Sequence, residues 1–286
     1  MDIRQRRDLA EEIWLGIDKM TWTGSEQEPD YVAKLVATLT GVIKRSLTVV
    51  MPGRRISVGG AFIHQKPIVH FVNKSGSRDP ELGDLLIVCR ERRASGDVYN
   101  AMLLQAKVTN DVWRATIQRD HQFILYSEWP MFEYKRAGAL NGKRRSVLPK
   151  TITQGAQYLL IDKNAPCNMW TATVDIPLQS SSCFAGTIAS IISFNEGRTF
   201  QATSPRDDWS QMILDLLQLA ATSVFNRRNS GFVREKRWNG PDAFDFILNL
   251  GQAGSDNYGQ GSAHNSEERD GVGGVSLICV DLGDGE

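Results

Sequence analysis

Three polar residues in two neighbouring apolar segments have the types and spacing that phosphodiester chemistry requires. Asp84 opens the run Asp-Leu-Leu-Ile-Val-Cys, while Gln105 and Lys107 close the run Tyr-Asn-Ala-Met-Leu-Leu-Gln-Ala-Lys-Val. Residues two apart in a strand point to the same face, so Gln105 and Lys107 are expected to project together. Adjacent strands lie about 4.8 Å apart, and a hairpin would therefore bring Asp84 beside that pair.

This set of side chains suits metal-assisted hydrolysis of a phosphodiester bond. Mg²⁺ prefers oxygen ligands and keeps several of its waters, so Asp84 would supply charge and Gln105 a neutral carbonyl oxygen. Lys107 would orient or help deprotonate the attacking water, or stabilise the phosphate in the transition state. The alternative is a hairpin with ordinary polar ends, but a polar pair at a buried position costs free energy unless it has a purpose.

Periodicity predicts the elements that must position these residues. Apolar residues at helical spacing predict helices over 2–20 and 30–47, and the period then changes to two, as in strands. The segments that carry Asp84 and Lys107 are almost continuously apolar, which is typical of central strands buried on both faces. The expected strands are 55–65, 67–72, 84–89, 99–108, 156–162, 169–176, 185–194 and 275–282, and the further helices are 111–129, 207–225 and 240–251.

The sequence from Pro80 to Asp84, followed by a hairpin and then Gln105-Ala-Lys107, resembles the PD-(D/E)XK nuclease superfamily. The resemblance covers roughly residues 1–135. It implies an α/β fold with a restriction-endonuclease-like core, in which a mixed central β-sheet is flanked by helices. It also implies that Asp84 and Gln105 bind Mg²⁺ or Mn²⁺ and that Lys107 is the catalytic lysine. In the next predicted helix, Gln122 and Tyr126 are similar to the Q-x-x-x-Y element of RecB-type exonuclease domains.

The chain departs from the family pattern at Gln105, where the family usually has an acid. Loss of this charge is expected to weaken metal binding, and Glu81, or Glu11 or Glu12 on the first helix, could supply the missing carboxylate. Q-x-K variants resemble effector nucleases of bacterial anti-phage systems. The resemblance therefore implies a metal-dependent deoxyribonuclease, with RNA not excluded as substrate. The alternative is a catalytically inactive subunit that keeps the nuclease fold to bind nucleic acid or a partner protein.

Charge is distributed unevenly along a chain whose formal net charge is zero. Residues 255–286 hold seven acids and one base, so the rest of the chain is positive. That positive part contains two clusters of Lys and Arg, at 135–150 and 227–237. Such clusters favour phosphate contacts, although a solvated surface is the commoner explanation. Trp129, Phe132 and Tyr134 could stack on bases or pack beneath a loop. The predicted nucleic-acid-binding residues are Lys135, Arg136, Lys143, Arg144, Arg145, Arg227 and Arg228.

Composition limits the remaining possibilities. Hydrophobic residues make up 41% of the 286 residues, which is enough for a packed core. The chain shows no long apolar run that would predict a membrane span, and its four cysteines form no C-x-x-C pair, as expected in a reduced cytoplasm. We expect a nuclease core over 1–135, followed by an extension or a regulatory subdomain over 136–286 that contains a mobile Gly/Ser-rich segment at 251–274. Homo-oligomerisation or a defence-system partner protein fits this organisation.

Overall fold

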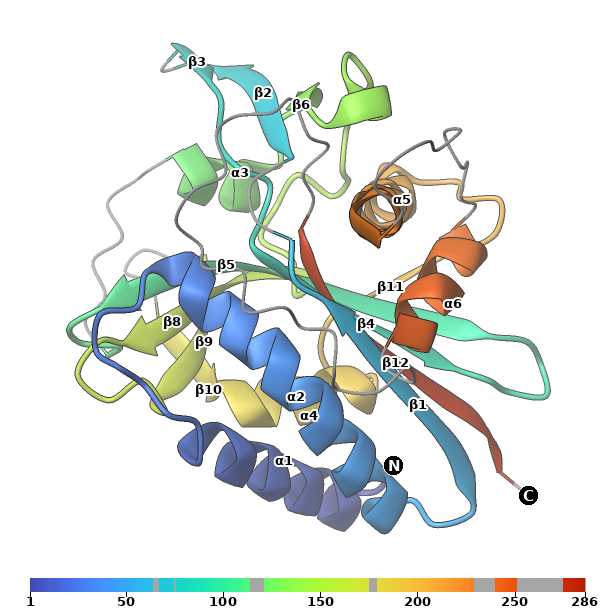
Figure 1. Ribbon diagram of the computed structural model, residues 1–286. Coiled ribbons are helices and arrows are strands. Elements are labelled where there is room, and N and C mark those ends of the chain that lie inside the picture. Colours follow the sequence, from blue (N-terminus) through green and yellow to red (C-terminus); the bar gives the residue numbers. More distant parts are fainter. Residues whose placement is uncertain are drawn as a thin grey trace.

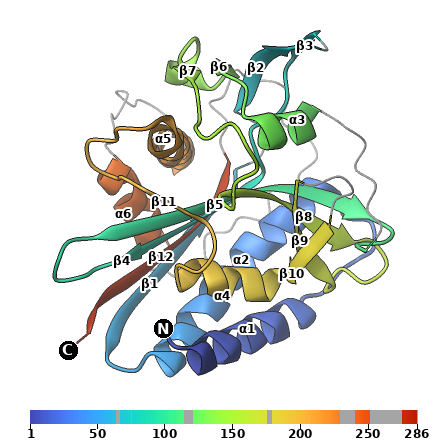
Figure 2. The same cartoon turned by 180° about the vertical axis from the view of Figure 1, so that it is seen from behind.

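A mixed β-sheet runs through the middle of the protein, with helices on both of its faces (Figures 1 and 2). The computed structural model describes residues 1–63, 67–74, 76–113, 121–174, 179–228, 240–250 and 275–285. Over these ranges the sheet has eight strands in the order β1-β12-β4-β5-β8-β9-β10, with β11 paired to β5. The strands are β1 (Arg54–Ala61), β4 (Leu85–Glu91), β5 (Val98–Thr109), β8 (Ala156–Asp162), β9 (Met169–Thr173), β10 (Gln179–Cys183), β11 (Arg198–Phe200) and β12 (Ser276–Gly285).

This sheet contains both parallel and antiparallel pairs. The β12–β4 and β5–β8 pairs are parallel, whereas β4–β5, β1–β12 and β8–β9 are antiparallel. A smaller sheet lies to one side, in the order β3-β2-β6-β7. Its strands are β2 (Ile68–Asn73), β3 (Gly76–Arg78), β6 (Phe132–Arg136) and β7 (Arg144–Arg145). The predicted α/β class with a mixed central sheet flanked by helices is therefore confirmed.

Three helices cover one face of the central sheet: α1 (Ile3–Asp18), α2 (Glu28–Val50) and α4 (Phe184–Ile192). Capping boxes start the first two, because Asp2 pairs with Gln5 and Gln27 pairs with Asp30. Their buried stripes follow the predicted helical spacing and pack against every second residue of β4 and β5. The helical side of this core includes Leu9, Ile13, Ile17, Leu35, Leu39, Ile43 and Ile188.

The opposite face carries α3 (His121–Glu128), α5 (Asp208–Arg228), α6 (Gly240–Leu250) and the smaller sheet (Figure 2). A second core forms there around Leu86, Val88 and Leu103. Gly59 on β1 allows a close approach of the α6 backbone. A Cβ at Gly59 would lie 2.2 Å from the Ile247 carbonyl oxygen.

The prediction of a strand over 185–194 is wrong, because this segment forms α4. Short apolar runs do not distinguish a buried strand from a buried helix. Here α4 lies beneath the sheet against α1, and nearly all of its side chains are buried. The helix predicted over 111–129 is shorter than expected. It is helical from His121 to Glu128, residues 110–113 are not helical, and residues 114–120 lie outside the described ranges.

The last strand of the chain lies inside the sheet rather than at its edge. β12 pairs with β1 on one side and with β4 on the other, so a strand from residues 136–286 lies between two strands from residues 1–135. Arg90 on β4 anchors this arrangement through ion pairs to Asp281 at 2.6 Å and Asp245 at 2.9 Å. The Gly/Ser-rich segment 251–274 lies outside the described residues.

Candidate active site

The candidate site forms where β5 extends past the start of β4. Leu85, the first residue of β4, pairs with Leu104, whereas on its other side β5 pairs with β8 as far as Thr109. Among the described strands, residues 105–109 of β5 therefore have no partner on the β4 side. The backbone N–H groups on that free edge need acceptors from elsewhere in the protein, because buried N–H groups are rarely left unpaired.

Two carboxylates accept hydrogen bonds from this free edge. The Ala106 N–H donates to Asp84 Oδ2 at 2.8 Å, and the Val108 N–H donates to Glu28 Oε1 at 3.3 Å. Alternate residues of a strand are roughly 7 Å apart, so the edge itself sets the separation of the two hydrogen-bonded carboxylate oxygens. Asp84 and Glu28 thus come from different elements, the start of β4 and the start of α2, and meet at one strand end.

Gln105 directly precedes Ala106 on β5 and is almost completely buried, with 1% of its surface exposed. Its Nε2 donates to Asp84 Oδ2, as expected from the hairpin register. Its Oε1 is buried and has no hydrogen-bond partner among the described residues. An unsatisfied buried carbonyl oxygen costs about 1–3 kcal/mol, so it calls for a specific explanation.

Lys107 follows on the same face of β5 as Gln105 and reaches the surface. About a quarter of its side chain is exposed (27%), and its Nζ lies 3.8 Å from Glu28 Oε2. The predicted convergence of Asp84, Gln105 and Lys107 therefore agrees with the register and contacts of the hairpin. Lys107 places a positive charge at the solvent side of a group that is otherwise acidic.

Asp84 is held in an environment that favours its neutral form. The pKa of this carboxyl is raised to about 7, chiefly by burial and also by the nearby charges of Glu81 and Glu28. The hydrogen bond from the Ala106 N–H and the charge of Lys107 act in the opposite direction. The raised pKa indicates that too little positive charge surrounds Asp84 to stabilise its ionised form in the folded protein.

Tyr126 and Glu81, both predicted from the sequence to belong to the site, do not contact the free edge of β5 directly in the described structure. The Tyr126 hydroxyl is fully buried and donates to the Leu82 carbonyl oxygen at 2.8 Å. This contact braces the segment leading to Asp84, where a Cβ at Gly83 would lie 2.9 Å from the Tyr126 oxygen. Glu81 forms an isolated bridge with Ile68 and contributes charge near Asp84. Gln122 is half-buried on α3 and makes no described polar contact with Asp84, Gln105 or Lys107.

Glu12 is not brought to the site. It is exposed on α1 and lines a groove with Val42 and Arg45, which belong to the second half of α2. Arg45 is 17 residues along this helix from Glu28, which corresponds to roughly 25 Å. The second carboxylate at the site, beside that of Asp84, comes from Glu28. Sequence reasoning missed it because it lies in a polar stretch, although an acid before Pro29 at a helix start was a usable signal.

The donor set fits a magnesium ion in its chemistry. Mg²⁺ is usually held by one or two carboxylates together with waters, and Asp84, Glu28 and the unpaired Gln105 Oε1 provide such oxygens. No group of three or more His, Cys, Asp or Glu side chains arranged to hold a metal was found in the described part of the chain. A metal here would therefore depend on the amide oxygen and on water as well as on the two acids.

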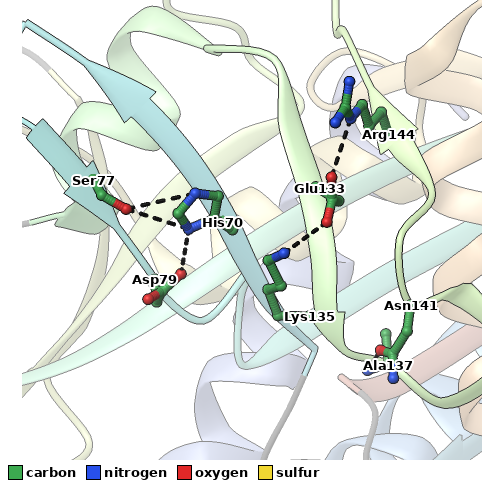
Figure 3. Close-up of polar contacts among 8 residues, drawn as sticks. All are labelled: His70, Ser77, Asp79, Glu133, Lys135, Ala137, Asn141 and Arg144. Atoms are coloured by element: carbon green, nitrogen blue, oxygen red, sulfur yellow. Dashed lines mark hydrogen bonds and ion pairs between the residues drawn. The ribbon is translucent and has the colours of Figure 1, made fainter.

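Acidic neighbours balance much of the first basic cluster. Glu133 forms ion pairs with Lys135 at 2.7 Å and with Arg144 at 3.1 Å (Figure 3). Arg145 forms a largely buried ion pair with Asp215 on α5 at 2.7 Å. Arg145 thus has a structural partner. Arg136 and Lys143 are exposed, and the side chains of Arg227 and Arg228 lie outside the described set.

The aromatic residues beside this cluster belong to the core. Trp129, Phe132 and Tyr134 each have at most 1% of their surface exposed, so the suggestion that they stack on bases is wrong. Trp129 instead stacks against Tyr126, with ring centroids 5.6 Å apart. The three rings fix the position of α3 and β6 behind Asp84.

Comparison of the chain with protein-family models, with curated proteins and with solved structures found no match. The functional argument therefore depends on the side chains and their geometry. Among the described helices, none has both the length and the apolar character needed to cross a bilayer.

Proposed function

We propose that this protein is a magnesium-dependent deoxyribonuclease with a restriction-endonuclease-like core of the PD-(D/E)XK type. One observation carries the proposal. Two carboxylates, a buried amide oxygen without a partner and a lysine meet at the free edge of a central strand. A cluster of polar groups with one buried, unsatisfied atom and one acid whose pKa is raised is typical of a functional site.

Each side chain has a distinct part in this proposal. Asp84, Glu28 and Gln105 would hold Mg²⁺ or Mn²⁺, which when bound supplies positive charge near the scissile phosphate. Glu81 adds negative charge close by without a direct contact to the free edge. Lys107 points to solvent beside Glu28, where it can bind the phosphate or orient the attacking water. Tyr126 acts as a positioning residue, because it holds the backbone that precedes Asp84.

Replacing Glu28 by glutamine should weaken metal binding. The substitution removes one of two carboxylates at the site while preserving the hydrogen-bonding oxygen for the Val108 N–H. We expect Mn²⁺ affinity to fall by about 10- to 100-fold, the usual cost of losing a group that supports a metal. Calorimetric titration measures this change, and Glu12→Gln is the matched control, because Glu12 is exposed on α1. Equal Mn²⁺ affinities for the Glu28→Gln and Glu12→Gln variants would show that Glu28 does not bind the metal.

Replacing Tyr126 by phenylalanine should loosen the segment before Asp84. The Leu82 carbonyl oxygen would lose its donor inside the core, at a cost of about 1–3 kcal/mol in the free energy of unfolding. Urea denaturation measures this change. Ser127→Ala is a suitable comparison, because that hydroxyl bonds only within its own helix, to Ile124. A loss no greater than that of Ser127→Ala would contradict the bracing role.

A second candidate function is a nuclease-fold subunit without catalytic activity that binds nucleic acid or a partner protein. The hydrogen bond from Gln105 Nε2 to Asp84 favours it, because an amide here neutralises no metal charge and already occupies a carboxylate oxygen. Metal titration of the wild-type protein separates the two candidates. Binding of Mn²⁺ that Asp84→Asn removes supports the nuclease, whereas no binding supports the inactive subunit.

The cellular role is proposed by analogy alone. Q-x-K nucleases resemble effectors of bacterial anti-phage defence, and such an effector would act in the cytoplasm with a partner protein or as a homo-oligomer. The four cysteines are free thiols in the structure, which is compatible with a reducing compartment. Cleavage of RNA by the same site would require no different metal or lysine chemistry.

A further inference from the structure

An aromatic pair with one exposed ring lies on the same face of the sheet as the candidate active site. Trp113 follows the end of β5 and has 60% of its surface exposed. Its ring meets that of the partly buried Trp170 on β9, with centroids 4.3 Å apart and an interplanar angle of 55°. Tryptophan is highly buried on average, so a ring exposed to this extent beside a site calls for a functional explanation.

Strand register connects this pair with Lys107. Lys107 on β5 pairs with Leu160 on β8, and Leu160 pairs with Trp170 on β9. Leu160 and Trp170 both contact the core on the α3 face, the face to which Gln105 and Lys107 also project. Two strand spacings separate Lys107 from Trp170, which corresponds to roughly 10 Å. An unpaired nucleotide or two would span this distance.

Both tryptophans are held in place by their surroundings. The Trp170 Nε1 donates to Asn168 Oδ1 at 2.7 Å, which fixes the orientation of the lower ring. The backbone N–H of Trp113 donates to Asp111 Oδ1 at 2.8 Å and the preceding residue, Val112, is buried, so the main chain that carries the Trp113 ring is held in place. A ring fixed in this way loses little conformational freedom when a base stacks on it, and this favours binding.

Positive charge is also available at this end of β5. Lys163 is exposed, and its backbone N–H donates to the Thr109 carbonyl oxygen at 2.8 Å. It lines a cavity of about 870 Å³ between the end of β5 and the start of α2, which Glu28 also lines. Lys163 thus adds a second lysine at this end of β5, in the cavity that Glu28 also lines.

We propose that Trp113, supported by Trp170, is a stacking platform for unpaired bases and that the substrate is DNA with a single-stranded segment at the site. Base pairs in a continuous duplex bury their faces against one another, so only an unpaired base can present a face to Trp113. Stacking on an aromatic side chain tolerates any base, and the platform would therefore add affinity without sequence preference. This inference rests on the proposed nuclease function and specifies its substrate class.

The test measures DNA binding without cleavage. Fluorescence anisotropy in EDTA compares a labelled thymidine oligonucleotide with a blunt duplex for the wild type and for three variants. Trp113→Ala should weaken binding of the single strand by about 5- to 150-fold, whereas Trp113→Phe should keep most of the affinity. Trp14→Ala is the matched control, because Trp14 is also exposed (45%) but lies on α1, on the other face of the sheet.

Two results would overturn the platform. One is a Trp113→Ala variant that binds the single strand as tightly as Trp14→Ala, in which case the pair serves another purpose such as a protein contact. The other is an equal loss of affinity for single strand and blunt duplex. Because no metal is present, the nuclease proposal is tested separately. Cleavage with normal binding by Trp113→Ala rejects only the platform, and stacking without metal-dependent cleavage rejects only the nuclease.

Discussion

Replacing Lys107 by alanine is expected to reduce metal-dependent cleavage of DNA by at least about 100-fold, because one preorganised positive charge beside the phosphate is lost. Lys107 is partly exposed, and its one charged partner in the described structure is Glu28 at 3.8 Å. The fold should therefore survive the substitution. Gel analysis of DNA incubated with Mg²⁺ measures the rate, and far-ultraviolet circular dichroism checks the fold.

Two further variants make the result specific to this lysine. Lys44→Ala removes an exposed lysine from α2, away from the free edge of β5, and should cleave at the wild-type rate. Lys107→Arg keeps the charge but changes its shape, so partial activity is expected. Wild-type cleavage by Lys107→Ala in a folded protein would refute the assignment of this residue, and with it the proposed nuclease site.

Replacing Asp84 by asparagine is expected to stabilise the metal-free protein at pH 8 while abolishing metal binding. Burial raises the pKa of this carboxyl from 3.8 to about 7. Ionisation of Asp84 is therefore less favourable in the folded than in the unfolded protein, and this lowers the free energy of unfolding at pH 8. The shift corresponds to at most roughly 4 kcal/mol. Asparagine keeps an acceptor for the Ala106 N–H and carries no charge, and it should recover a large part of this cost.

The pH dependence follows from the direction of the shift. Between about pH 4 and pH 7 the folded protein binds a proton at Asp84 that the unfolded chain has released, so this residue lowers stability progressively as pH rises. Above about pH 7 the cost is constant. The gain from Asp84→Asn should accordingly be small at pH 4 and should level off above pH 7.

Urea denaturation in EDTA across this pH range measures the effect. Asp8→Asn is the control, because Asp8 is exposed on α1 and its substitution should change stability little at any pH. Added Mn²⁺ should then stabilise the wild type and leave Asp84→Asn unchanged. A destabilised Asp84→Asn variant at pH 8 would mean that Asp84 is a structural anion, and would count against a metal site here.

The hairpin part of the site was predictable because it is local. Asp84 and Gln105 belong to two consecutive strands, and antiparallel pairing of consecutive strands sets which residues lie opposite each other. Period-two spacing then placed Lys107 on the same face as Gln105. In the same way, the helical spacing of apolar residues was sufficient to locate α1 and α2 to within a few residues.

The contacts of Glu28 and Arg145 could not be predicted from the local sequence pattern. Glu28 reaches the free edge of β5 only because α2 packs across the sheet, some 80 residues before its partner Val108. Arg145 belonged to a run of bases that resembled a phosphate-binding patch, but its partner Asp215 comes from a distant helix. Burial of α4 on nearly all sides likewise removed the periodicity that distinguishes a helix from a strand.

The sequence by itself determined the α/β class, the central hairpin and the identity of the polar residues at its end. Those features depend on side-chain periodicity and on pairing between neighbouring segments, both of which are encoded over a few residues. Only the tertiary structure decided that Glu28 joins Asp84 on the free edge of β5, that Gln105 keeps a buried oxygen without a partner, and that Trp170 lies in register with Lys107. Such contacts depend on how distant elements pack, and no short stretch of sequence specifies that packing.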